Sequence, residues 1–471
     1  MSQFFSRRQL LRDSACGFGS LALAAICSEQ SGAAGNPLLS KTPHFTPRAK
    51  RVIFMFMQGG PSQMETFDYK PRLNAEHGKP VPFDRDENVE QGGIDAMRLF
   101  GSGWKFRPCG QAGIQVSELF PEVGKKIDEI CVLNGMQADS LAHAPACLQL
   151  HTGDTNFVRP SMGAWITYGL GTDNRNLPGF LTIAPPLFGD AGNPKFFGSG
   201  FLPTIYQGTS IGLSNKGAVI RYLKGNSISE DLQRQQLDLI QSMNREHLAQ
   251  LENDQHMEGM IEAFELAFRM QNETPELLDL SGETEATLNL YGIGEQQPTD
   301  FFGRQCVLAR RMAEAGVRFI QLNSIGWDHH GNIRKRLPAN CRQVDKPIAG
   351  LLTDLRSRGL LDETLLVWAG EFGRTPYEQD LSMGKDGYGR GHNPYGFTTW
   401  LAGGGIQGGM VFGRTDDYGY RAVDGQVHIH DLHATILHLL GIDHEQLTYR
   451  HGGRDFRLTD IHGRIVKEII S

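Results

Sequence analysis

Three short apolar segments, each followed at once by glycine or polar residues, constrain the fold of this chain most. They span residues 52–57, 317–322 and 365–368, and they lead into the sequences Gln-Gly-Gly, Trp-Asp-His-His and Gly-Glu. Apolar runs of this length are typical of parallel strands that are buried on both faces. Helical patterns at 301–316 and 340–358 precede the second and third strands. This alternation predicts an α/β fold with a mostly parallel central sheet flanked by helices.

The stretch 227–272 has a different pattern. Its apolar residues recur at helical spacing in two segments, which predicts a helical hairpin inserted in the domain and laid over the sheet. A cofactor-binding role for its Met and Phe residues is the alternative, and core packing is the favoured interpretation. The residues concerned are Leu232, Leu239, Ile240, Met243, Met257, Met260, Ile261, Phe264 and Phe268.

The N-terminus has the pattern of an export signal. Arg7 and Arg8 precede a mild apolar stretch at 15–26 and small residues near position 34. Paired arginines indicate the twin-arginine route, so we expect a leader at 1–34, a single domain at 35–471, and a periplasmic or extracellular protein. The apolar stretch is too short for a stable membrane span. Ile26 stands where a lipoprotein has a small residue before its cysteine, which argues against a lipid anchor on Cys27.

Composition excludes two classes of function. The net charge is −7 and no Lys/Arg run stands out, so nucleic acid is not an expected partner. Five cysteines remain after the leader, at scattered spacings and without a Cys-x-x-Cys pair. This pattern argues against a disulfide framework and against a cysteine-based zinc site.

Polar residues at the strand ends provide the candidate chemistry. Asp328 and His330 form an Asp-x-His pair after the second strand, and His392 lies in a glycine-rich segment that we expect to be a loop. Zinc and similar divalent cations accept this mixed set of nitrogen and oxygen ligands. We therefore predict a metal site on Asp328, His330 and His392. Glu371 is expected to be a further ligand or a base, with Arg374 three residues later.

A second group of histidines, His428, His430 and His433, has two interpretations. The His-x-His-x-x-His spacing is compatible with metal binding, but an amphipathic helical pattern begins at this point. Capping of that helix is favoured, with His430 or Asp431 as the capping residue. His430 is the member of this group expected to come nearest to the metal site.

The segment 141–153 resembles the signature of sulfatases, in which the nucleophile opens a helix that ends in Thr-Gly. Aligned on Pro145 and on the Thr-Gly at 152–153, His143 occupies the nucleophile position. A helix N-terminus stabilises anions, and imidazole can act as a nucleophile, a base or a metal ligand. His143 cannot become formylglycine, and Cys147 lies four residues too late to do so.

The chain as a whole resembles the uncharacterised family called domain of unknown function 1501. The resemblance covers nearly all of the expected mature chain. It implies an alkaline-phosphatase-like fold, related to the sulfatases, and a twin-arginine leader. The segments that carry it are 56–63, 159–163, 327–332, 370–376, 392–394, 430–435 and 453–460.

Within that superfamily, hydrolysis of phosphate or sulfate esters uses two metal sites. The resemblance places Asp328, His330 and His392 in one of them, while Glu371 stands where an Asp is usual. Gly59 and Gly60 stand where a carboxylate normally follows the first strand, which implies that the second site is degraded.

These observations predict an exported metal-dependent hydrolase of sulfate or phosphate esters. The cofactor is a divalent metal, with zinc, calcium and manganese as candidates, and the partner is an anionic ester, with sulfated polysaccharide as a candidate. His143, Glu371 and Arg374 are the predicted catalytic residues, and Arg390 and Ser62 are predicted to bind substrate. The alternative is a non-catalytic binding or scaffold protein that retains the fold with a degenerate site.

Overall fold

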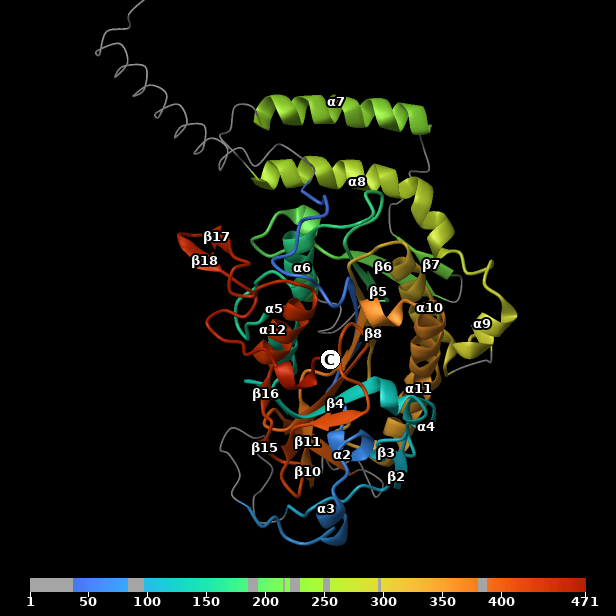
Figure 1. Ribbon diagram of the computed structural model, residues 1–471, viewed down its shortest axis with the longest axis vertical. Helices are drawn as coiled ribbons and strands as arrows, with labels where there is room; N and C mark the ends of the chain where they lie inside the picture. The colour runs from blue at the N-terminus through green and yellow to red at the C-terminus, as the bar shows by residue number, and fades with distance from the viewer. Residues whose placement is uncertain are drawn as a thin grey trace, which may run out of the picture.

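The computed structural model describes residues 37–83, 97–184, 194–214, 217–220, 229–248, 255–294, 298–379 and 388–471. The expected leader at 1–34 lies outside these residues. The described chain forms a central sheet with helices on both faces (Figure 1). No helix in these ranges has both the length and the apolar character needed to cross a membrane.

The central sheet is mostly parallel, as predicted. Its strands follow the order β13-β4-β12-β9-β1-β8-β5-β6-β7, with β16 also beside β4. The exceptions are β12, which is antiparallel to both neighbours, and β7, which is antiparallel to β6. The strands are β1 (Arg51–Met57), β4 (Ile130–Gln137), β5 (Phe180–Ile183), β6 (Thr209–Ser214), β7 (Gly217–Val219), β8 (Phe319–Ser324), β9 (Thr364–Ala369), β12 (Phe397–Ala402), β13 (Met410–Phe412) and β16 (Val427–His428).

Alternation along the buried strands divides the core into two layers. In β1, Val52, Phe54 and Phe56 pack with one set of helices, and the intervening residues Ile53, Met55 and Met57 pack with the other. Both faces of this strand are covered, which explains its unbroken apolar sequence. The first layer contains α5 (His143–Thr152), α6 (Met162–Leu170) and α12 (Ile429–Leu439). The second contains α10 (Asp300–Glu314) and α11 (Ile333–Ser357).

Both helices expected between the strands are present, but α11 begins at Ile333 rather than near residue 340. Pro338 lies inside it, and an internal proline normally disfavours a helix. Ile333 and Leu337 are fully buried in the second core layer, and their burial offsets that cost.

The helical hairpin is present as α7 (Glu230–Leu248) and α8 (Gln255–Leu278). It does not lie over a face of the sheet. Figure 1 shows it at one end of the molecule, where α8 contacts β7, α10 and the short 3-10 helix η5 (Thr204–Tyr206). Of the apolar residues singled out in the sequence, Ile261 is buried, as are Leu266 and Met270 of the same helix. The expected core packing is wrong for the exposed members of the set, which are Leu232, Leu239, Ile240, Met243, Met260 and Phe264.

Smaller elements complete the described chain. The short helices are α2 (Gln63–Thr66), α3 (Pro71–Ala75), α4 (Pro121–Gly124) and α9 (Glu285–Leu290). The two-stranded sheets are β2 (Phe106–Cys109) with β3 (Ile114–Ser117), β10 (Gly373–Gln379) with β11 (Gly389–Asn393), β14 (Arg414–Thr415) with β15 (Ala422–Asp424), and β17 (Tyr449–His451) with β18 (Arg454–Phe456). All five cysteines of the described residues are free thiols.

Candidate metal centre

Four parallel strands end at the same edge of the sheet and deliver the candidate residues there. β1 is parallel to β8 and to β9, and β4 runs in the same direction because β12 is antiparallel to both β4 and β9. Open α/β sheets carry their ligand sites at the carboxyl ends of such strands. Gly59 follows β1, Asp328 follows β8, Glu371 follows β9, and His143 begins α5 after β4.

His392 reaches this edge from a different element. The segment around it was expected to be a loop, but it forms strand β11, in which His392 is paired with Arg374 of β10. The neighbouring glycine explains the difference. A Cβ at Gly389 would lie 2.2 Å from the carbonyl oxygen of His329, so glycine here permits close packing of two backbones rather than a flexible loop.

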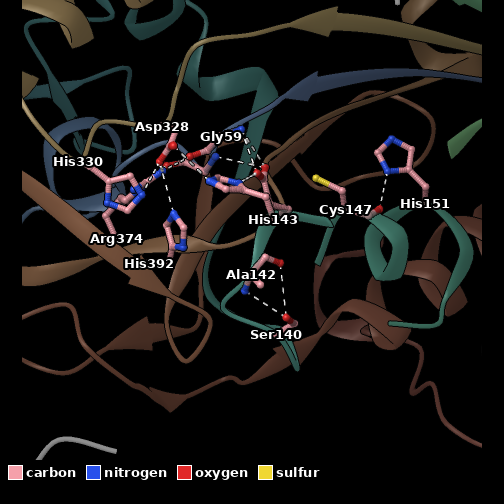
Figure 2. Close-up of polar contacts among 12 residues, drawn as sticks. Gly59, Ser140, Ala142, His143, Cys147, His151, Asp328, His330, Arg374 and His392 are labelled. Carbon is pink, nitrogen blue, oxygen red and sulfur yellow. Dashed lines mark hydrogen bonds and ion pairs between the residues drawn. The ribbon is translucent and has the colours of Figure 1, made fainter. Parts of the chain in front are cut away.

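Asp328 is the centre of the cluster. Its Oδ1 lies 3.0 Å from Nε2 of His330 and 3.4 Å from Nε2 of His392. Its Oδ2 lies 3.3 Å from Nε2 of His143. One ligand atom from each of these four residues lies within 4.8 Å of all the others. Figure 2 shows the three rings pointing at the carboxylate, while Cys147 and His151 lie farther along α5 and take no part.

These distances fit a single metal ion. Zinc–nitrogen bonds of about 2.0–2.1 Å in a tetrahedron place neighbouring ligand atoms about 3.3 Å apart. The contacts from Oδ1 of Asp328 to His330 and His392, at 3.0 and 3.4 Å, are close to that separation, while His143 lies 3.3 Å from the other oxygen, Oδ2. Nε2 of His143 is buried and has no well-aligned hydrogen-bond partner, which is the condition of a nitrogen placed to bind an ion.

Two of the rings are oriented from behind by other side chains. Nδ1 of His143 lies 2.7 Å from Oε1 of Glu371, and Nδ1 of His330 lies 2.5 Å from Oε1 of Gln379. An acceptor at Nδ1 holds the proton on that nitrogen and leaves the Nε2 lone pair for a metal. Glu371 therefore orients His143 in this structure.

The two glycines after β1 hold the carboxylate of Glu371 in place. The backbone N–H groups of Gly59 and Gly60 donate hydrogen bonds to the Glu371 carboxylate, at 3.0–3.2 Å. Gly59 has φ of +117°, and a Cβ there would lie 2.3 Å from the backbone nitrogen of Asp328. At the place where the superfamily resemblance led us to expect a carboxylate, this chain provides backbone donors and close packing instead.

Arg374 supports Asp328 from the interior. Its guanidinium is fully buried and lies 2.6 Å from Oδ1 of Asp328. It also donates to the carbonyl oxygens of Gly60 and Arg390 at 2.9 and 3.0 Å, and to that of Gly59. The charge of Arg374 is thus directed at Asp328.

The charges in the cluster shift two ionisation equilibria. Burial would raise the pKa of Asp328, but the neighbouring imidazoles of His143, His330 and His392 hold it well below its usual range. Burial disfavours a charged His143, but the carboxylates of Asp328 and Glu371 outweigh this and raise the pKa of His143 to about 9. The metal-free cluster thus binds a proton on His143 near neutral pH.

Arg390 and Ser62, predicted to bind substrate, are placed elsewhere. Arg390 is fully buried in an ion pair with Glu65, 2.5 Å between Nη2 and Oε1. Its Nη1 donates to the carbonyl oxygen of Thr375 at 3.0 Å, and its Nη2 donates to that of Phe100 at 2.6 Å. The hydroxyl of Ser62 donates to the same Glu65 carboxylate. The structure brings neither residue to the Asp328 cluster.

The histidines at 428–433 cap a helix, as favoured above, although the N-cap is His428 itself. Nδ1 of His428 accepts from the backbone N–H of His430 at 3.3 Å, and Asp431 accepts from the N–H of His428 at 3.1 Å. His433 is buried, with Nε2 2.8 Å from the carbonyl oxygen of Leu150. None of the three histidines belongs to the Asp328 cluster.

Sequence reasoning missed Gln379. It lies at the end of β10, and it contacts His330 only because the β10–β11 hairpin folds back over the strand ends. No local motif marks a glutamine in this role, so the sequence carries no signal for it.

Comparison with known proteins identifies the family. A family model described as "Protein of unknown function (DUF1501)" matches residues 49–470. The chain belongs to this family. The resemblance read from the sequence motifs is thereby confirmed. No curated protein has a significant match to this sequence.

Similar solved structures include Ps i-CgsB, a sulfatase and an alkaline phosphatase. Ps i-CgsB in complex with k-i-k-neocarrahexaose is 12% identical, with a TM-score of 0.37, over 83% of this chain and 72% of that chain. The PsFucS1 sulfatase from Pseudoalteromonas sp. is 13% identical, with a TM-score of 0.35, over 84% and 69%. The alkaline phosphatase from the Antarctic bacterium TAB5 is 10% identical, with a TM-score of 0.33, over 85% and 99%. All three scores are below 0.5, so the candidate metal centre of this DUF1501 member rests on its own geometry.

Proposed function

We propose that this protein is a metal-dependent hydrolase of anionic esters, with sulfate and phosphate esters as its substrate class. Asp328, His330 and His392 hold one divalent ion, and His143 faces the group that is transferred. The observation that supports this most is the convergence of three imidazole Nε2 atoms on one carboxylate at metal-ligand spacing. Rings held from behind by Glu371 and Gln379 are typical of metal ligands and catalytic bases.

The charge of the cluster supports an anionic substrate only when an ion is bound. Asp328, Glu371 and Arg374 together carry one net negative charge when the histidines are neutral. A divalent cation would reverse this to one net positive charge. The side chain of Asp328 is 40% exposed, so the centre is open to a ligand from solvent.

His143 is placed to move a proton in this reaction. A bound divalent ion would polarise the ester oxygens and favour the neutral form of the adjacent His143 ring. Nε2 of His143 would then accept a proton from water as the water oxygen bonds to sulfur or phosphorus. The ester bond breaks with its electron pair on the leaving oxygen, which takes the proton back from Nε2. Glu371 holds Nδ1 throughout and stabilises the imidazolium.

A structural ion in a binding protein is the second candidate. It is favoured by the presence of four side chains, His143 included, that can close a tetrahedral shell, because closed shells are typical of structural zinc. His143→Gln separates the two functions. The hydrolase proposal expects the ion to be retained and turnover to be lost, whereas a closed four-ligand site expects the ion itself to be lost.

The first test is the metal content of protein purified without a histidine tag, compared with Asp328→Ala and His392→Ala. We expect one divalent ion per chain at the Asp328 centre of the wild type, and more than a hundredfold weaker binding at this centre in both variants, since even outer-shell changes cost about 10–100-fold. Circular dichroism of each variant checks that it is folded. A metal-free wild type after reconstitution with zinc, manganese or calcium would reject the site.

The metal-loaded protein is then assayed on sulfate and phosphate esters, including sulfated oligosaccharides, with and without a chelator. Hydrolysis that requires both the ion and His143 supports the proposal. Full metal occupancy without hydrolysis of any ester would favour the binding protein.

We also propose export by the twin-arginine route, supported by Arg7 and Arg8 ahead of the apolar stretch. Replacement of both arginines by lysine should retain the protein in the cytoplasm, as measured by cell fractionation. Unchanged export of this variant would contradict the proposal.

A further inference from the structure

A second group of metal-type side chains lies where β4 and β16 end. These strands are parallel neighbours, with Val427 opposite Met136 and His428 opposite Gln137. Asp139 follows β4 by two residues, and His430 lies in the first turn of α12, which follows β16. Parallel pairing therefore brings Asp139, His428 and His430 together by the same rule that assembles the Asp328 cluster.

The three side chains have the spacing of a metal site. Nε2 of His428 lies 3.1 Å from Oδ1 of Asp139, and the rings of His428 and His430 are 5.0 Å apart between centroids. One ligand atom from each of the three residues lies within 4.8 Å of the others. The side chains of Asp139 and His428 are 57% and 27% exposed, so an ion can reach the group from solvent.

His430 provides an independent indication of a ligand. It is only 5% exposed, and its Nδ1 has no hydrogen-bond partner. A buried polar atom without a partner is costly, and each such atom in a folded protein requires an explanation. Burial, together with the neighbouring His428 and His462, lowers the pKa of His430 to about 4, which leaves the neutral imidazole that binds metals.

The carboxylate is oriented by α5. The backbone N–H of Asp139 donates to Oε1 of Gln149 at 3.0 Å, and Nε2 of Gln149 donates to Oδ2 of Asp139. This pair of bonds directs Oδ1 toward His428. Such outer contacts are characteristic of carboxylates that bind ions.

We propose that Asp139, His428 and His430 form a second metal site, for zinc or a similar transition-metal ion. Two imidazoles and one carboxylate are a ligand set that such ions accept, with the remaining positions taken by water. Coordination through Nε2 of His428 transfers the ring proton to Nδ1. The protonated Nδ1 can no longer accept the 3.3 Å cap bond from the backbone N–H of His430, so this bond is lost, while the bond from the N–H of His428 to Asp431 remains.

An ion at this site would also hold in place the loop that leads from β4 into α5. Asp139 and His143 are four residues apart on that loop, and they belong to the two different clusters. Binding at the second site thus restrains the segment that presents His143 to the first.

The test is the number of zinc ions bound per chain by tag-free protein, measured by mass spectrometry after zinc loading and dialysis. The variants are Asp139→Asn, which keeps the shape of the side chain, and His428→Asn, which removes the imidazole but retains a good helix N-cap. Asp328→Ala serves as the control for the first centre. Thermal unfolding of the metal-free proteins checks that each variant is folded.

We expect two ions in the wild type, one in each of the three single variants, and none when Asp139→Asn is combined with Asp328→Ala. Unchanged zinc in either Asp139→Asn or His428→Asn would overturn the second site. The two proposals fail separately. If the wild type binds one ion and only Asp328→Ala loses it, the second site is rejected. If the wild type binds one ion and only Asp139→Asn and His428→Asn lose it, the first site is rejected.

Discussion

Two buried arginines of the β10–β11 hairpin meet carboxylates in different ways. Arg390 and Glu65 are 0% and 1% exposed, and further donors and acceptors of the chain satisfy both. Arg374 also pairs with a carboxylate, but Asp328 is 40% exposed and faces three imidazole nitrogens. The Glu65–Arg390 pair is saturated by the chain itself, so it holds the structure together. The Asp328 cluster leaves ligand atoms directed at one another, and the proposed metal site rests on this difference.

Removal of one partner of the saturated pair should have the largest effect on stability. Arg390→Met leaves Glu65 buried and uncompensated, so we expect the free energy of unfolding to fall by about 3–5 kcal/mol. Urea unfolding measures this, and the metal content of the folded fraction should not change. The double variant with Glu65→Leu should recover much of the loss. If Arg390→Met kept its stability but lost its metal, the distinction between the Glu65–Arg390 pair and the Asp328 cluster would be wrong.

The pH dependence of the metal-free protein should come from the open cluster. Because the folded state raises the pKa of His143 from 6.5 to about 9, the stability gained by protonation is fully present below pH 6.5. It is lost as the pH rises through about 9, with a fall in unfolding free energy of up to about 3 kcal/mol.

Urea unfolding at several pH values, with a chelator present, measures this slope. His143→Gln lacks the titrating group, so its stability should be nearly constant over the same range. An equal slope in His143→Gln and the wild type would assign the titration to another group.

Gln379 allows a smaller and more specific test of the open cluster. Gln379→Leu removes the acceptor at Nδ1 of His330, so we expect metal affinity to weaken by about 10–100-fold with little change in stability. Gln379→Glu retains an acceptor and is the matched control. Competition with a metal-binding dye gives both affinities, and equal binding by the leucine variant would remove Gln379 from the site.

The smallest expected effect is that of Ser62→Ala. The hydroxyl donates to Glu65, which remains paired with Arg390, so the loss should be about 1 kcal/mol. Metal binding should be unaffected. A strong loss of ester hydrolysis in this variant would instead support the substrate contact expected from the sequence.

The sequence predicted the residues at the strand ends but not the partners of all of them. Asp328 and Glu371 were expected at the carboxyl edge because apolar runs locate parallel strands, and such strands end together. His143 was found through the resemblance of 141–153 to the sulfatase signature, not through a predicted strand. The strand that carries His392 was read as a loop because its glycines serve close backbone packing, which no local pattern distinguishes from a turn. The position of the helical hairpin was also wrong, because helical periodicity does not specify the surface on which a helix packs.

The sequence by itself therefore determined the alternation of strands and helices, the apolar core and the identity of the metal-type residues. These depend on local patterning along the chain. Only the tertiary structure decided that Arg374 supports Asp328 while Arg390 pairs with Glu65, that Gln379 contacts His330, and that Gly59 and Gly60 hold Glu371. Each of these contacts joins segments that are distant in the sequence or depends on the register of the β10–β11 hairpin, and long-range packing sets both.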